Sequence, residues 1–477
     1  MNYKMIKNVL GWILLFESLF MLVPLITAAV YWEKAFFSFL ITLGICLVLG
    51  LVLAKKRPEN TTLYSKEGFV IVSLSWIVLS LFGCLPFILS GSIPSFIDAL
   101  FETVSGFSTT GATILADVES LPRSILMWRS FTHWVGGMGV LVFLMAFLPL
   151  SGGNNMHIMK AESTGPSVSK LVPRVKTTAL ILYSIYFALT ALLFVILLFG
   201  DMTVFESLNT AFATAGTGGL GFRNDSMASF SPFSQIVITV FMLLFSINFG
   251  CFYLLFLRKF KEAFNVEVRC FIILVAVSIA IITLNTREIF VTLEDALRNV
   301  SFTVASIIST TGFSTVDFDL WPEVSKNCIV LLMFTGGCAG ATCGGIKLSR
   351  FIILIKGMFK ELHTSVHPKQ VKKITIDSKP VEHEVVRATN SYMIAFLLVF
   401  VASMIAISFD DHDFTTNFTA VAAMLNNIGP GLEMVGPTQN YSFFSTPTKL
   451  VLIFDMLAGR LELFPMLLLF SPATWKK

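Results

Sequence analysis

The sequence predicts an all-α polytopic membrane protein that contains four copies of one internal repeat. Of its 477 residues, 55% are hydrophobic and only 13% are charged, whereas a soluble globular chain usually carries about 25% charged residues. Apolar stretches of about 20 residues, the length needed to cross the hydrocarbon core, recur along the whole chain. Between successive pairs of stretches lies a shorter Thr-, Ser- and Asn-rich segment that ends in glycine, and its recurrence predicts the repeat.

Ten apolar stretches are long enough to cross the membrane. The first follows Lys4 and Lys7 and so resembles a signal peptide, but its apolar run is too long for that role and it lacks a convincing cleavage site. We therefore expect it to be retained as the first membrane helix. The stretches lie near residues 9–31, 35–54, 67–90, 124–150, 178–200, 231–257, 270–286, 323–357, 386–409 and 446–470.

The basic residues predict the orientation of the chain. With both termini in the cytoplasm, 25 of the 34 Lys and Arg fall in cytoplasmic segments, as the positive-inside rule requires. The net charge of +4 is then an orientation signal and does not indicate nucleic acid as a partner. The outer connections tend to be acidic, as at Asp317, Asp319 and Asp411. Such residues fit either a mouth that concentrates cations or ordinary solvated loops.

Signals for an enzyme or a metal cofactor are missing from the sequence. The seven cysteines show no paired metal-ligand spacing, and Cys338 and Cys343 are the only close pair. An intramembrane protease or lipid hydrolase needs a nucleophile with a base, or a metal motif, at membrane depth. Neither G-x-S-x-G nor H-E-x-x-H occurs, so the chain is predicted not to be an enzyme.

The four repeated segments begin at Phe101, Phe205, Asn299 and Phe414, and each is too short to cross a membrane. Irregular backbone at membrane depth is tolerated only where protein buries it or water lines it, and a re-entrant helix followed by a loop meets that condition. Close helix packing would explain any one terminal glycine but not the fourfold placement. The four ends read STTG at 108–111, ATAG at 213–216, STTG at 309–312 and NNIG at 426–429.

These segments predict a filter for a monovalent cation. A half-helix that enters from outside points its negative C-terminal end toward the membrane centre. Glycine lets the following loop turn its carbonyls toward a common axis, and rings of carbonyls from four loops can replace the hydration shell of potassium. No carboxylate lies in the four ends, which argues against a divalent-cation filter. Further glycines at 218, 219 and 221 leave the register of the second loop open. The predicted potassium-binding residues are Thr109, Thr110, Gly111, Thr214, Ala215, Gly216, Thr310, Thr311, Gly312, Asn427, Ile428 and Gly429.

The eighth stretch predicts a broken helix. It is far longer than one crossing needs, and its middle holds five glycines, each costing roughly 1 kcal/mol in a helix relative to alanine. A mobile loop there, inside the third repeat and below the filter, suggests a gate, and a packing kink is the alternative. The glycines are Gly336, Gly337, Gly340, Gly344 and Gly345.

Arg460 lies in the middle of the last stretch, where an arginine costs about 2.5–3.5 kcal/mol. Candidate partners are Asp455, Glu462 and the carbonyls freed by the broken helix. An arginine below a cation filter opposes cation passage and so suggests a role in gating, and a structural ion pair is the alternative. Three other polar residues, Glu17, Arg129 and His133, stand alone in their stretches, and we expect neighbouring helices to satisfy them.

Several motifs carry a resemblance to a known family. They are HWVGGMGVLVF from His133, FTGGCAGATCGGIKLSR from Phe334, VHPKQVKKI from Val366, NNIGPG from Asn426 and GRLELFP from Gly459. Over essentially the whole chain the sequence resembles the superfamily of bacterial potassium transporters that includes the TrkH and KtrB families, and it is most similar to the TrkH family. The resemblance implies four units of helix, pore loop and helix around a pseudo-fourfold pore, after two extra N-terminal transmembrane helices. The corresponding divisions are 1–62, 63–165, 166–262, 263–362 and 363–477.

The same resemblance implies potassium uptake across the bacterial cytoplasmic membrane by a homodimer with one pore per protomer. It places the filter at Gly111, Gly216, Gly312 and Gly429, and the gate at the broken helix and Arg460. A sodium-permeable pore, or potassium symport coupled to sodium or protons, is the alternative. A cytoplasmic nucleotide-binding ring protein of the TrkA type is the implied partner, and the basic segment 356–387 is a plausible docking surface. ATP, ADP or NAD would act through that partner, because this chain has no glycine-rich phosphate loop.

Overall fold

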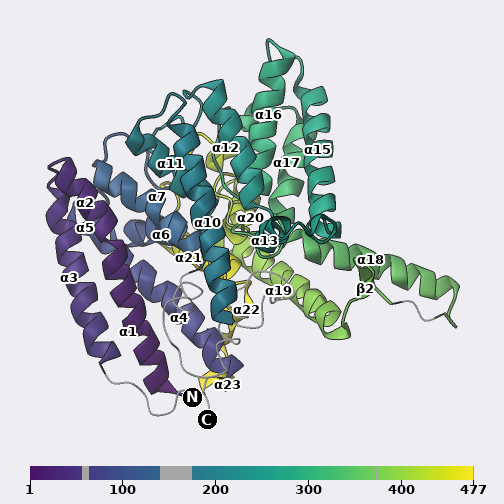
Figure 1. The fold of residues 1–477 in the computed structure, drawn as a ribbon, viewed down its shortest axis with the longest axis horizontal. Helices are drawn as coiled ribbons and strands as arrows, with labels where there is room; N and C mark the ends of the chain where they lie inside the picture. The colour runs from purple at the N-terminus through teal and green to yellow at the C-terminus, as the bar shows by residue number, and fades with distance from the viewer. Residues whose placement is uncertain (56–63, 140–174, 371–372, 476–477) are drawn as a thin grey trace.

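The computed structural model describes residues 1–55, 64–139, 175–370 and 373–475, and it is almost entirely helical (Figure 1). Six helices among these residues are long and apolar enough to cross a membrane, and the bent pair α12–α13 makes a seventh if it is one span. The other three predicted spans are divided into shorter helices or are only partly described. Residues 140–150 of the fourth predicted span lie outside the described residues, and so does the segment 160–174, which contains Lys160, Lys170 and Arg174.

The first two predicted spans form an N-terminal scaffold. The first consists of α1 (Tyr3–Phe20) and α2 (Leu22–Val30), and the second is α3 (Ala35–Ala54). They lie along one flank of the molecule (Figure 1, purple). A Cβ on Gly11 of α1 would lie 2.6 Å from the backbone nitrogen of Ala54, so small residues let the two helices approach closely.

The remaining chain consists of four units with the same order of elements: a long helix, a short helix, an irregular loop and a further helix. The long first helices are α4 (Ser65–Gly83), α10 (Val175–Leu197), α15 (Val266–Thr286) and α19 (His383–Ile407). The short helices are α6 (Phe96–Phe107), α11 (Val204–Gly216), α16 (Leu293–Ile308) and α20 (Phe414–Leu425). The closing helices begin with α7 (Arg123–Gly137), α12 (Pro232–Phe245), α17 (Glu323–Thr335) and α21 (Thr446–Arg460).

All four short helices begin in the same way. The N-cap side chain of each accepts a hydrogen bond from the backbone N–H three residues later, which satisfies one of the free donors at the helix start. Each helix has 12 to 16 residues, too few to cross a membrane, and its C-terminal half is buried. The sequence prediction of four short helices, each too short to cross a membrane, agrees with this geometry. The N-caps are Ser95, Thr203, Thr292 and Asp413.

The closing helix is broken in the second, third and fourth units, and in the first unit the residues after 139 lie outside the described part of the chain. α12 bends by 92° into α13 (Phe249–Phe256), α17 is separated from α18 (Leu348–Val366) by residues 336–347, and α21 is followed after three residues by α22 (Phe464–Phe470). The sequence predicted only the break in the third unit. The breaks within the predicted spans 231–257 and 446–470 were not foreseen. The first, at 246–248, contains no glycine or proline, and the second lies between Gly459 and Pro465.

Short elements complete the described part of the chain. They are α5 (Leu85–Leu89), α14 (Phe260–Ala263), α23 (Pro472–Trp475), the 3-10 helices η1 (Phe318–Leu320), η2 (Ser408–Asp410) and η3 (Glu433–Val435), and the hairpin of β1 (Thr375–Ile376) and β2 (Lys379–Pro380). In the hairpin, Thr375 pairs with Pro380 and Ile376 with Lys379. The hairpin and α18 form an arm that leaves one side of the bundle (Figure 1).

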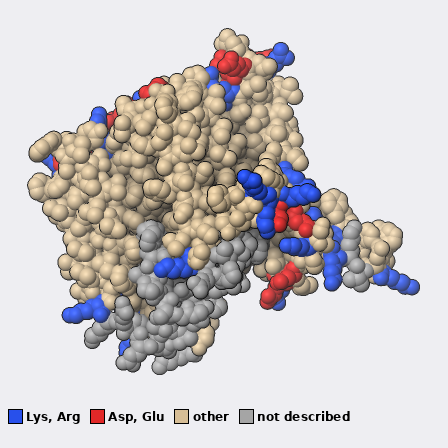
Figure 2. Space-filling model, viewed as in Figure 1, with Lys and Arg blue, Asp and Glu red and all other residues tan. Residues whose placement is uncertain are grey.

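Both ends of the chain lie on the same side of the molecule, as an even number of spans requires (Figure 1). Lys66 Nζ donates to the carbonyl of Ala473 at 3.2 Å and so joins the start of α4 to the C-terminal end. In Figure 2, Lys, Arg, Asp and Glu gather at the ends of the bundle and around the arm, while the broad side between them carries almost none. An uncharged belt between charged ends is what a lipid-embedded surface requires.

Candidate ion-binding loops and gate

The loops that follow the four short helices share one backbone conformation. Each has two residues with positive φ separated by one residue, and the second is always glycine. The residue between them donates its backbone N–H to the carbonyl five residues earlier, at 2.8–3.0 Å in all four loops. The pairs are Thr109 and Gly111, Thr217 and Gly219, Thr310 and Gly312, and Asn427 and Gly429.

This geometry corrects the predicted register of the second loop. Thr214, Ala215 and Gly216 lie in the last turn of α11, whereas Thr217, Gly218 and Gly219 occupy the positions of Thr109, Thr110 and Gly111. The sequence alignment matched the wrong glycine because ATAG resembles STTG. Gly216 has another reason to be glycine: a Cβ there would overlap the carbonyl of His133 on α7.

The four loops close into a ring. A Cβ on Gly111 would overlap the carbonyl oxygen of Gly218, one on Gly219 that of Thr311, and one on Gly312 that of Ile428. A Cβ on Gly429 would lie 2.8 Å from the carbonyl oxygen of Thr110, which returns to the first loop. At each position glycine is needed twice, for its positive φ and for the space that a neighbouring carbonyl fills. Four carbonyls therefore lie between adjacent loops at equivalent positions.

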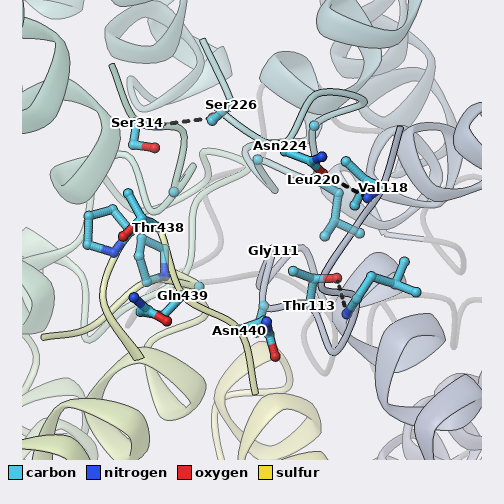
Figure 3. Close-up of a pocket in the computed structure, with 18 of the residues that line it drawn as sticks. Gly111, Thr113, Val118, Leu220, Asn224, Ser226, Ser314, Thr438, Gln439 and Asn440 are labelled. Carbon is cyan, nitrogen blue, oxygen red and sulfur yellow. Dashed lines mark hydrogen bonds between the residues drawn. The ribbon is translucent and has the colours of Figure 1, made fainter. Parts of the chain in front are cut away.

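A cavity of about 120 Å³ lies at the ring and is lined by residues of all four units (Figure 3). Its lining contains no carboxylate side chain. The two cationic side chains in it are paired: Arg129 with Glu102 and Arg223 with Glu206, each at 2.8 Å. The cavity therefore presents mainly backbone and neutral polar groups.

The acidic residues of the outer connections mostly hold loops in place. Asp317 accepts hydrogen bonds from the backbone of Asp319 and from Thr438, and Asp410 accepts two from Ser445. Of the two interpretations of these acids, solvated structural loops fit the contacts better than a charged mouth.

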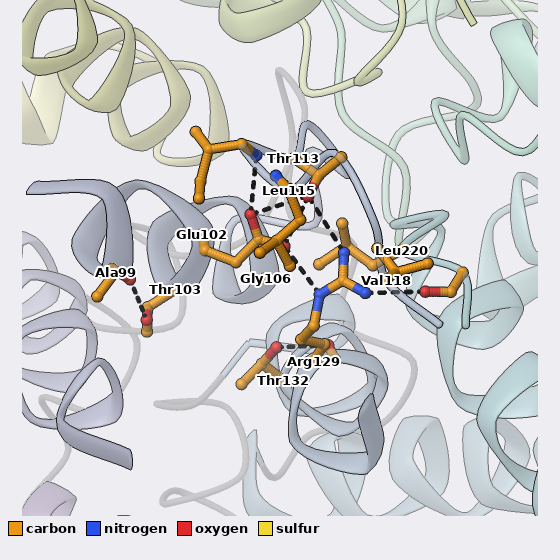
Figure 4. Close-up of polar contacts among 12 residues, drawn as sticks. Ala99, Glu102, Thr103, Gly106, Thr113, Leu115, Val118, Arg129, Thr132 and Leu220 are labelled. Carbon is orange, nitrogen blue, oxygen red and sulfur yellow. Dashed lines mark hydrogen bonds and ion pairs between the residues drawn. The ribbon is translucent and has the colours of Figure 1, made fainter. Parts of the chain in front are cut away.

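A buried ion pair braces the first loop against the second (Figure 4). Arg129 on α7 donates from Nε to Glu102 of α6 at 2.8 Å, and both side chains are almost fully buried. The carboxylate of Glu102 also accepts from the Thr113 hydroxyl and the backbone N–H of Ile114, while Arg129 Nη1 donates to the carbonyl of Gly221 at 2.9 Å. The Glu102 carboxylate thus binds the first loop, and the Arg129 guanidinium binds the second.

His133, one helical turn after Arg129, makes a second brace. Its Nδ1 lies 2.7 Å from the carbonyl of Gly106 at the end of α6, and its Nε2 accepts from the backbone N–H of Leu220 at 3.1 Å. A neutral ring protonated on Nδ1 satisfies both contacts. From the sequence, Arg129 and His133 were expected only to be satisfied by neighbouring helices. Their spacing of four residues on one helix face was the available signal.

The expectation that neighbouring helices satisfy Arg129 and His133 is confirmed, but the same expectation for Glu17 was wrong. The Glu17 side chain is fully buried, and neither of its carboxylate oxygens has a hydrogen-bond partner among the described residues.

Residues 336–347, here called the intramembrane loop, lie directly against the ring. The backbone N–H of Gly344 donates to the hydroxyl of Thr310 at 2.7 Å, and a Cβ on Gly344 would overlap the carbonyl of Asn426. The loop is also bound to the break in the second unit, since the N–H of Cys338 donates to the carbonyl of Ser246 at 2.9 Å. The predicted helix break is confirmed, and the loop lies beneath two of the four filter loops.

Arg460, the last residue of α21, joins three parts of this site. Its guanidinium donates to the Thr109 hydroxyl at 3.3 Å, to the Thr342 carbonyl at 2.7 Å and to the Gly137 carbonyl at 2.7 Å. Carbonyls of the broken helix were among the predicted partners. The two predicted carboxylates have other contacts: Glu462 pairs with Arg350 at 2.5 Å, and Asp455 accepts from Ser403 at 2.7 Å.

The site has the chemistry of a carbonyl-lined passage. Within the described part of the chain, no group of three or more His, Cys, Asp and Glu side chains could hold a metal ion. The groups that converge are instead backbone carbonyls and hydroxyls, which suit a weakly hydrated monovalent cation.

Comparisons with known proteins agree with this architecture. Residues 34–477 match the TrkH family, described as "Cation transport protein". The chain is 36% identical over 485 residues to the Trk system potassium uptake protein TrkH of Salmonella typhimurium and equally to that of Escherichia coli K12, with 100% of both chains covered in each case. The crystal structure of the potassium transporter TrkH from Vibrio parahaemolyticus superposes with a TM-score of 0.90 at 32% identity, covering 100% of both chains.

Proposed function

Since this chain belongs to the TrkH family of cation transport proteins, we propose that it takes up potassium across the bacterial cytoplasmic membrane through the ring of four loops. The observation that carries the proposal is the closed set of contacts in which the carbonyls of Thr110, Gly218, Thr311 and Ile428 each abut a glycine of the neighbouring loop. Relatives of similar length are named potassium uptake proteins.

The ring acts as the selectivity filter. Its carbonyls replace the hydration shell of a potassium ion as the ion enters from the outer cavity. The C-terminal ends of α6, α11, α16 and α20 lead into the ring, and each adds about half a negative charge that favours a cation. The neutral lining of the cavity does not select for divalent ions.

Stored strain supports a functional role for the loops. Thr109, Thr217, Thr310 and Asn427 all have φ near +55° without being glycine. Residues held in such conformations cost on the order of 1–3 kcal/mol each and persist only where the surroundings impose them. The braces at Arg129 and His133 supply part of that constraint, because they tie the first two loops to α7.

The intramembrane loop and Arg460 form the gate. The loop blocks the inner side of the filter through its contacts with Thr310 and Asn426. Arg460 places a positive charge beside Thr109 and opposes cation passage while it remains bound to Thr342. Opening requires the loop to leave the filter and Arg460 to lose or exchange at least the Thr342 contact.

The proposal also includes a second protomer and a cytoplasmic partner. A homodimer with one pore per protomer binds a cytoplasmic nucleotide-binding ring of the TrkA type, and ATP, ADP or NAD acts through that ring. The arm supports this interpretation, since α18 and the hairpin leave the bundle and carry many basic residues (Figure 2). Both chain termini are then cytoplasmic, because they lie at one end of the bundle.

A sodium-permeable pore, or symport coupled to sodium or protons, remains the second candidate, because the same ring of four filter loops serves either mechanism.

Rubidium uptake into proteoliposomes that contain the purified protein tests the proposal. Excess potassium should block uptake and excess sodium should not. Equal competition by sodium would favour the second candidate. Uptake equal to that of empty liposomes, both with and without a TrkA-type partner added, would contradict the transport function.

A further inference from the structure

We propose that Glu267 is the positioning residue that holds the intramembrane loop closed against the filter. The proposal rests on the gating role given to that loop above and adds a residue outside the loop and outside the filter. Glu267 lies in the first turn of α15, which opens the third unit, and its N-cap is Asn265.

Glu267 and its two backbone donors, Ala339 and Ser349, are here called the clasp. Its Oε1 accepts hydrogen bonds from the backbone N–H of Ala339 at 2.8 Å and from that of Ser349 at 3.1 Å. These two donors are ten residues apart and lie on either side of the segment that carries Gly344. One carboxylate oxygen therefore draws together the two ends of the part of the loop that touches the filter.

The chemistry favours a carboxylate at this position. Ser349 lies in the first turn of α18, where free N–H groups and the helix dipole attract negative charge. Hydrogen bonds from N–H groups to an ionised acceptor are roughly twice as strong as neutral ones. Two other contacts that hold the loop, from Cys338 to Ser246 and from Gly344 to Thr310, join neutral groups, whereas the Thr342 carbonyl accepts from the charged Arg460.

A buried cation within the loop also stabilises its closed conformation. The ammonium of Lys347 donates to the carbonyl of Cys343, and the Lys347 side chain is almost fully buried. The loop thus folds over its own lysine while Glu267 holds its ends from outside. Cys343, at the centre of this arrangement, has no exposed surface.

Cys343 provides a direct report on the clasp. In a protein that retains Cys343 and has alanine at the other six cysteines, a charged methanethiosulfonate reagent should label the thiol slowly, because the closed loop buries it. Glu267→Ala should raise the labelling rate at least about tenfold, a change that corresponds to about 1.4 kcal/mol. Glu267→Gln keeps one acceptor oxygen without the charge and should give a smaller rise.

Two controls separate release of the loop from general loosening. A protein that retains only Cys46, which is buried in α3 of the scaffold, should label equally slowly with and without Glu267→Ala. Glu262→Ala, at a nearby and mostly exposed glutamate on α14, should leave Cys343 labelling unchanged. If Glu267→Ala does not fold, the isosteric Glu267→Gln decides the question.

The outcomes also distinguish the clasp from the function on which it rests. Faster labelling of Cys343 together with raised rubidium leak supports both. Faster labelling without any change in rubidium flux supports the clasp and contradicts the gating role. A Cys343 labelling rate within twofold of the parent in both Glu267 variants, or an equal rise at Cys46, overturns the proposal.

Discussion

The guanidinium of Arg460 donates a hydrogen bond to the carbonyl of Thr342 at 2.7 Å, which joins the end of α21 to the middle of the intramembrane loop. The same guanidinium reaches the hydroxyl of Thr109 in the first filter loop. Filter, loop and last helix therefore meet at one side chain. Because the bond to Thr342 is one of several that hold the loop, its loss should weaken the closed state without unfolding the protein.

Arg460→Ala should raise potassium flux several-fold. The substitution removes the positive charge beside Thr109 and releases the carbonyl of Thr342, so both the electrostatic barrier and the closed loop are weakened. Initial rates of rubidium uptake at matched protein content measure the effect. Arg460→Lys is the matched control, since it keeps the charge but not the set of hydrogen bonds. Its flux should lie between that of the parent protein and that of Arg460→Ala. Unchanged or lower flux in a folded Arg460→Ala protein would remove the barrier role.

Shortening the intramembrane loop between Gly336 and Gly345 should leave a leaky pore. The shortened loop cannot place Gly344 against the Thr310 hydroxyl, so the inner side of the filter is no longer covered. Rubidium leak from loaded proteoliposomes without any partner protein measures this. A tighter pore in the shortened protein would mean that the loop promotes conduction.

The corrected register of the second loop gives a comparison of two glycines. Gly111→Ser and Gly219→Ser should each lower the potassium-to-sodium permeability ratio by about tenfold, which corresponds to about 1.4 kcal/mol. A side chain at either position would overlap or displace a carbonyl of the neighbouring loop. Gly216→Ser should instead reduce the yield of folded protein, because it presses α11 against His133. The ratio follows from competition of potassium and sodium with rubidium.

An inverted result would restore the first alignment. If Gly216→Ser folds well and loses selectivity while Gly219→Ser keeps it, the filter position in the second loop is Gly216 and the correspondence of backbone angles has no functional meaning.

The elements that the sequence predicted well are those whose signals are local. Each short helix begins at a capping Ser, Thr or Asp, and each loop contains a glycine that its own backbone conformation requires. The broken helix was predictable for the same reason, since Gly336, Gly340 and Gly345 all have positive φ. Such features depend on the residue itself and therefore show in one sequence.

Features that depend on distant partners were not predictable. The breaks at 246–248 and 461–463 contain no glycine or proline, and the first is held by residues of the intramembrane loop, such as Ala339, which accepts from Asn248. Arg129 and His133 reach partners 92 and 87 residues away in the second loop. The register at Gly216 was missed because short patterns of Thr and Gly recur within six residues, and only the ring contacts distinguish them.

The buried pair of Glu102 and Arg129 gives the last prediction. Breaking a buried ion pair by removing one partner typically costs about 3–5 kcal/mol, because the other charge is left uncompensated. Glu102→Gln should therefore lower the thermal stability of the purified protein. It should also lower the potassium-to-sodium ratio, because the one oxygen that remains cannot serve Arg129, Thr113 and Ile114 as the two carboxylate oxygens do. The double variant Glu102→Gln, Arg129→Gln should lose less stability than the two single losses added together.

The pair of Glu206 and Arg223 is a matched control, because it has the same 2.8 Å separation in the second unit but is partly exposed. Exposed ion pairs contribute about 0–1 kcal/mol, so Glu206→Gln should change stability little and leave the ion ratio unchanged. Thermal unfolding in detergent and rubidium competition in proteoliposomes measure both pairs side by side. Equal losses at the two pairs, or additive losses in the double variant, would show that Glu102 and Arg129 do not act together as the brace of the first two loops.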